Sequence, residues 1–111
     1  MVLTGLFGNE TASKTLLYLE NYGSGYAQVI SKTFDLSLSQ VQRQLERFER
    51  EGVLASRLVG KTRLYTFNPR CFYQNELKEI LKKAIERLPE NLIQLYFRNR
   101  QRPRRAGKPL P

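Results

Sequence analysis

The segment from Ser37 to Gly52 constrains the fold most, because the sequence marks both ends of one helix there. The four residues beginning at Ser37 read S-L-S-Q, the spacing of a capping box that satisfies two N–H groups at a helix start. Gly52 stands where a left-handed residue commonly ends a helix. The spacing therefore predicts a helix over 38–51. Its buried stripe is formed by Val41, Leu45 and Phe48.

The opposite face of this helix is polar and suited to contact base edges and phosphates. It carries Ser39, Gln40, Gln42, Arg43, Gln44, Arg47 and Arg50. Arg43 is the favoured contact. Arg50 lies four residues after Glu46, so it is better explained as part of a solvated, charged helix face than as a DNA contact. Surface glutamines are common, and Gln40 and Gln42 become candidates only because they follow the capping box.

A basic hairpin follows the helix. The runs 53–58 and 62–67 favour strands, and Gly60 can adopt the positive φ of a two-residue type II′ loop. In this register one face of the hairpin can be buried, and it consists of Leu54, Leu58, Tyr65 and Phe67. Three bases project outward or lie near the tip: Arg57, Lys61 and Arg63. We expect a protruding ribbon over 54–67 with a basic surface.

Two helices are predicted before the capped one. Apolar residues at helical spacing indicate a helix over 10–22, with Asn9 as its N-cap and Gly23 at its end. A second helix is expected over 25–34 with Ser24 as its cap. A tight connection then leads into the capped helix.

Two apolar helices are predicted after the hairpin. The first carries its apolar residues between Leu77 and Leu88, and a shorter one covers about 90–97. Because two more apolar helices exceed what one small core needs, we expect a homodimer interface here. The predicted organisation is a 1–70 domain, dimerisation helices over 71–97, and a basic flexible tail over 98–111.

The net charge points to a polyanionic partner. The chain of 111 residues has 19 Lys and Arg against 10 Asp and Glu, a net charge of +9. Six of those bases and no acid lie in 98–111, so most of the net charge belongs to the tail. We interpret its arginines as a general phosphate clamp, although RNA binding or a solubilising role fits equally; they include Arg102, Arg104 and Arg105.

Composition also excludes several chemistries. The chain has no histidine and a single cysteine, Cys71, so it lacks the residues for a Ser-His-Asp triad or a cysteine metal cage. We expect no enzyme activity, no metal and no cofactor. Cys71 is expected to pack as a small apolar residue, an intersubunit disulfide being the alternative. No export signal or membrane span is expected, and the cysteine usage fits a cytoplasmic protein.

Three helices followed by a basic ribbon predict a fold that is mostly α with a small β-hairpin, a winged helix-turn-helix with added C-terminal helices. The residues LSLSQVQRQLERFEREGVL resemble the recognition helix of ArsR-type regulators, and SRLVGKTRLYTFNP resembles their wing. The likeness is closest to stand-alone forms of a winged-helix module also found fused to nucleotidyltransferase domains. Two positions depart from the family pattern: Ser31 replaces a small Ala, and Asp35 replaces a Gly in the turn.

The resemblance implies a sequence-specific transcriptional regulator, by default a repressor, that binds double-stranded DNA as a homodimer. It places Ser39, Gln40, Gln42 and Arg43 in the groove and Arg57, Lys61 and Arg63 on the wing. The cysteine pair of the metal-sensing branch is missing, so metal sensing is not expected. The alternative is a winged-helix module that binds protein or RNA without reading DNA sequence. The sequence does not identify an effector.

Overall fold

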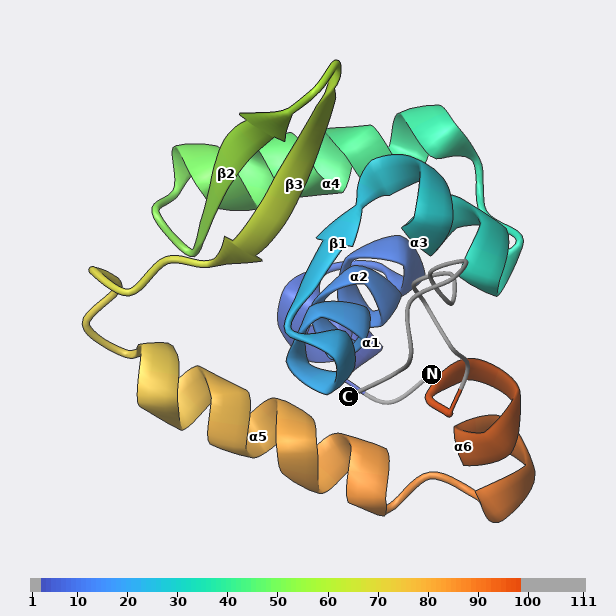
Figure 1. The fold of residues 1–111 in the computed structure, drawn as a ribbon. Helices are drawn as coiled ribbons and strands as arrows, with labels where there is room; N and C mark the ends of the chain where they lie inside the picture. The colour runs from blue at the N-terminus through green and yellow to red at the C-terminus, as the bar shows by residue number, and fades with distance from the viewer. Residues whose placement is uncertain (1–2, 99–111) are drawn as a thin grey trace, which may run out of the picture.

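The computed structural model describes residues 3–98, and its elements follow one another in the order of a winged helix-turn-helix (Figure 1). From the N-terminus they are α1 (Thr4–Phe7), α2 (Glu10–Tyr22), β1 (Ser24–Tyr26), α3 (Ala27–Phe34), α4 (Leu38–Arg50), β2 (Leu54–Val59), β3 (Thr62–Phe67), α5 (Gln74–Glu86) and α6 (Glu90–Tyr96). The mostly helical fold with a β-hairpin is confirmed. The bounds of α2, α4 and both hairpin strands lie within one residue of those predicted.

The start of the helix predicted over 25–34 is wrong, and Ser24 does not cap it. Ser24–Tyr26 instead form β1, which pairs antiparallel with β3 and gives a sheet of order β1-β3-β2. Gly25 is buried in this strand, where a Cβ atom would lie 2.7 Å from Cε1 of Tyr18. Glycine is therefore needed for the strand to approach α2 closely.

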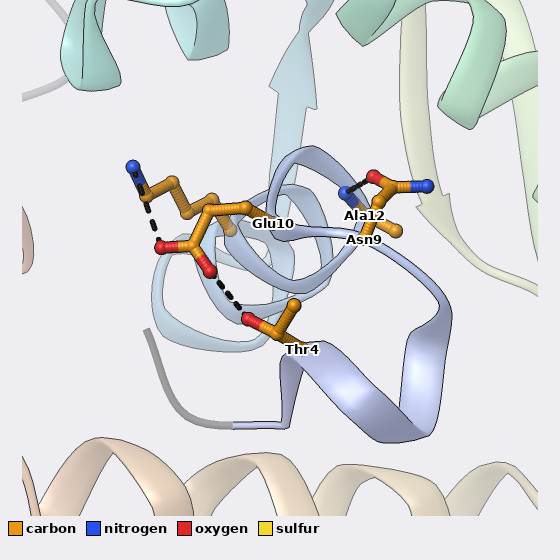
Figure 2. Close-up of polar contacts among 5 residues, drawn as sticks. Thr4, Asn9, Glu10 and Ala12 are labelled. Carbon is orange, nitrogen blue, oxygen red and sulfur yellow. Dashed lines mark hydrogen bonds and ion pairs between the residues drawn. The ribbon is translucent and has the colours of Figure 1, made fainter.

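The turn between α1 and α2 is held by polar side chains (Figure 2). Asn9 is the predicted N-cap, and its Oδ1 accepts a hydrogen bond from the backbone N–H of Ala12 at 2.7 Å. The carboxylate of Glu10 accepts from the Thr4 hydroxyl and lies 3.8 Å from Nζ of Lys14. These contacts fix α1 against the start of α2.

The core is built around α2, which contacts both α4 and α5. Leu16, Leu17, Tyr18 and Leu19 are four consecutive residues, and each is at most 2% exposed. A helix with only one covered face could not bury four consecutive side chains. The two flanking helices therefore bury α2 from opposite sides.

The C-terminal helices complete this same core. Their buried side chains are Leu77, Leu81, Ala84, Leu88, Ile93 and Phe97. Nδ2 of Asn21 donates to the Phe97 carbonyl at 2.9 Å, and the Tyr22 hydroxyl donates to the Tyr96 carbonyl at 2.7 Å, so α2 caps the end of α6. The subunit uses these helices in its own core, but apolar side chains within 71–97 also stay exposed, among them Phe72 and Leu95. The homodimer stays a prediction.

The hairpin has the predicted register but extends beyond the core. Val59 pairs with Thr62 across a two-residue loop, and Gly60 has a φ of 64°. Of the face predicted to be buried, Leu54, Tyr65 and Phe67 are buried. Leu58 is 61% exposed, so its predicted burial is wrong. It lies next to the loop, where the ribbon projects past the core (Figure 1).

Candidate nucleic-acid interface

The two ends of α4 determine which of its faces is exposed. Oγ of Ser37 accepts a hydrogen bond from the backbone N–H of Gln40 at 3.3 Å, the serine half of the predicted capping box. At the other end Gly52 has a φ of 83°, its N–H donates to the Glu49 carbonyl, and the Val53 N–H donates to the Phe48 carbonyl. These are the two bonds of a Schellman motif. The predicted stripe is buried, and the exposed candidates are Ser39, Gln40, Gln42 and Arg43.

The connection between α3 and α4 is a tight turn. Asp35 adopts the left-handed conformation, with φ 56° and ψ 50°, in place of the glycine common in similar turns. The backbone N–H of Leu36 donates to the Ser31 carbonyl at 2.8 Å and closes the turn. Ser31 is buried, and its hydroxyl donates to the Gln28 carbonyl at 2.9 Å. Both departures from the resembled pattern are therefore accommodated.

The wing is basic and open to solvent. Its strands and loop contain three bases and no acid, and all three bases are exposed. Arg57 pairs with Leu64 and Arg63 pairs with Leu58, so these two arginines lie on opposite faces of the ribbon. Lys61 belongs to the loop itself. The wing thus presents positive charge on both faces and at its tip.

A hollow of about 370 Å³ separates α4 from the wing. Gln42 of α4 lines it, as do Lys61 and Arg63 of the wing, so three predicted site residues meet here. Glu46 also lines the hollow, and sequence reasoning missed this role. Its spacing of four residues from Gln42, which puts both on one helix face, was the signal that could have found it.

Arg63 is turned toward α4. The Ser56 hydroxyl donates to Oε2 of Glu49 at 2.6 Å and accepts from Nη1 of Arg63 at 3.0 Å, which joins the helix to the wing. Burial raises the pKa of the neighbouring Tyr65 hydroxyl; the carboxylates of Glu49 and Glu46 raise it further, and Arg63 lowers it. With these carboxylates nearby, Arg63 is less available to a phosphate than the other two wing bases.

Arg47 lies apart from the exposed face. Its Nη2 donates to the Phe7 carbonyl at 3.0 Å, and its guanidinium lies over the Phe48 ring, 4.7 Å from the centroid. The Phe7 carbonyl is at the C-terminal end of α1, where backbone acceptors lack helical partners. Arg47 therefore attaches α1 to α4, and the DNA contact predicted for it is not supported by its position. Arg102, Arg104 and Arg105 lie outside the described residues.

Within residues 3–98, no group of three or more His, Cys, Asp or Glu side chains is placed to hold a metal ion. No helix in that range is long and apolar enough to cross a membrane. Comparisons with models of protein families, with curated proteins and with solved structures found no match. The winged helix-turn-helix class rests on the element order, the sheet order and the turn geometry of the chain itself.

Proposed function

We propose that the protein is a sequence-specific DNA-binding transcriptional regulator that inserts α4 into the major groove and places its wing on the adjacent backbone. One observation carries the proposal: Gln42, on the exposed polar face of α4, lines an open hollow together with Lys61 and Arg63 of an acid-free basic ribbon. An exposed helix reads base edges and a basic ribbon binds phosphates in winged helix-turn-helix proteins. A fold of this class alone does not imply DNA binding, so the charge and exposure of these residues matter.

Each exposed group has a role that its chemistry suits. Gln40 and Gln42 can form paired hydrogen bonds to adenine, and Arg43 can form them to guanine. The Ser39 hydroxyl, at the N-terminal turn of α4, suits a phosphate oxygen. Arg57 and Lys61 suit the flanking backbone, with Arg63 as a weaker contributor; Arg47 is left out of the interface.

The assembly and setting are part of the same proposal. A homodimer would bind a roughly palindromic site whose half-sites lie about one helical turn apart. A regulator of this kind acts on DNA in the cytoplasm, and repression by promoter occlusion is the default mode. Kinship with ArsR-type regulators rests on the resemblance of α4 and the wing.

Selection of bound fragments from genomic DNA, followed by footprinting, tests the proposal. We expect protection of a short symmetric sequence. Arg43→Ala should weaken binding about 5- to 150-fold, because a lost base contact costs about 1–3 kcal/mol. Arg50→Ala removes the same charge from the last turn of the same helix and should change affinity by less than about threefold. Length-dependent binding that ignores sequence would favour a nucleic-acid module without base readout.

A further inference from the structure

A second hollow, of about 290 Å³, lies where α1, α4 and the start of α5 meet. Most of its lining residues are apolar or aromatic and include Leu6, Leu16, Phe48 and Leu77, but polar atoms contribute nearly half of its surface. Leu6 is 63% exposed at the rim, so the hollow is open to solvent. Its volume is at the lower end of the roughly 300–1,000 Å³ range of small-molecule pockets.

Arg47 supplies a cationic group to this apolar wall. One of its nitrogens, Nη2, is bonded to the Phe7 carbonyl, whereas Nε is buried and has no hydrogen-bond partner among the described residues. A buried N–H without an acceptor is costly, and a guanidinium can donate five hydrogen bonds. Among the described residues this one N–H of Arg47 therefore has no acceptor.

The chemistry of the wall indicates which acceptor fits. A carboxylate forms the strongest hydrogen bonds with a guanidinium, and an aromatic ring matches the surrounding leucines and Phe48. Glu51 also lines the hollow, but it is exposed whereas Arg47 is half-buried, so water and salt screen the charge of Glu51 more than that of Arg47. A small molecule with a ring and one carboxylate satisfies both halves of the site.

We propose that this hollow binds a small aromatic carboxylate, held by the Arg47 guanidinium after a rotation of the side chain that turns the buried Nε toward the carboxylate. Arg47 is one helical turn from Arg43 on α4, so a ligand that alters the bond to α1 acts on the helix proposed to read DNA. The binding site stands independently, whereas the regulatory role rests on the proposed function.

Sodium benzoate is the probe, with neutral benzamide as its matched control, and backbone amide NMR shifts of the full chain report binding without DNA. We expect benzoate to bind with a millimolar Kd, typical of so small a ligand, and to shift amides near residues 6–8, 47–53 and 73–77. Benzamide should bind at least tenfold more weakly. Equal binding of both, or benzoate shifts elsewhere, would overturn the proposal.

Two variants test the role of Arg47 and of the exposed rim of the hollow. Arg47→Gln should weaken benzoate at least tenfold. Because that variant also loses a structural contact, Leu6→Glu at the exposed rim provides a second test that repels the carboxylate without disturbing the core. Ile80→Glu, at an exposed position of α5 outside the hollow, is the control and should bind benzoate normally. A dimer that Leu6→Glu dissociates would show that a second copy covers this surface, which also overturns the proposal.

The regulatory part is measured separately, on the selected DNA. If the two sites are coupled, saturating benzoate changes DNA affinity, and DNA changes benzoate affinity by the same factor. Unchanged DNA affinity with benzoate bound would reject the regulatory role and leave the binding site intact.

Discussion

Replacing Arg47 by alanine should destabilise the fold, because this residue holds α1 against α4. Its Nη2 is 3.0 Å from the Phe7 carbonyl, and its guanidinium lies over the Phe48 ring. Sequence reasoning assigned the same residue to DNA. Stability and DNA affinity therefore distinguish the two roles.

The size of the effect follows from three contributions. A hydrogen bond from a charged donor contributes about 1.5–3 kcal/mol. Packing of the guanidinium on the ring adds about 0.5–1 kcal/mol. Removal of the buried Nε, which has no hydrogen-bond partner among the described residues, raises the free energy of unfolding by about 1–2 kcal/mol and so offsets part of this loss. The net loss is about 0–3 kcal/mol with a midpoint of about 1.5 kcal/mol, and the midpoint lowers the Tm of a domain of this size by roughly 6–12 °C.

Thermal and urea unfolding followed by circular dichroism measure this loss. Arg50→Ala is the matched control, since Arg50 is exposed in the last turn of α4 and its loss should change stability by no more than about 0.5 kcal/mol. If Arg47→Ala were as stable as Arg50→Ala but bound DNA far more weakly, Arg47 would belong to the interface and our reasoning would be refuted.

Three further changes have definite expected outcomes. Gly25→Ala should lower the free energy of unfolding in urea by about 1–3 kcal/mol, because the new Cβ would clash with the Tyr18 ring. Gly5→Ala in α1 is the control: its Cβ would have no neighbour within 4 Å, so the change should be neutral or slightly stabilising. Burial raises the pKa of Glu20, so the folded state binds the proton more tightly than the unfolded state does. The free energy of unfolding should therefore fall as pH rises from the ordinary carboxyl pKa through the raised one. Glu20→Gln should flatten that fall, and an unchanged pH profile would contradict this prediction. For a chain ending at Phe97, the slope of log DNA affinity against log salt concentration should be shallower by several units, because the tail arginines no longer displace counterions. An unchanged slope would show that the tail does not contact DNA.

Local sequence patterns predicted the structural features that depend only on residues close together in the chain. The capping serine and Gly52 lie at the two ends of α4, and Gly60 specifies the two-residue loop that sets the hairpin register. Each of these features depends on residues close in sequence. The candidate face of α4 could therefore be predicted before any tertiary contact was known.

Distant contacts account for what the sequence did not predict. The strand Ser24–Tyr26 is too short to show alternation and exists because β3, about 40 residues later, pairs with it. Leu58 lies on the predicted face, but alternation does not tell how far the core extends beneath a ribbon. Arg47 was assigned to the surface because helical spacing cannot reveal that α1 folds back to cover that part of α4.

The central claim is that α4 and the wing form one DNA-binding surface. Titration of isotope-labelled protein with a selected duplex, followed by backbone amide NMR shifts, tests it most directly. We predict that the largest shifts occur over 38–43 and 57–63, with α5 and α6 little changed. Shifts concentrated on α5, or DNA binding that leaves α4 unperturbed, would contradict the account.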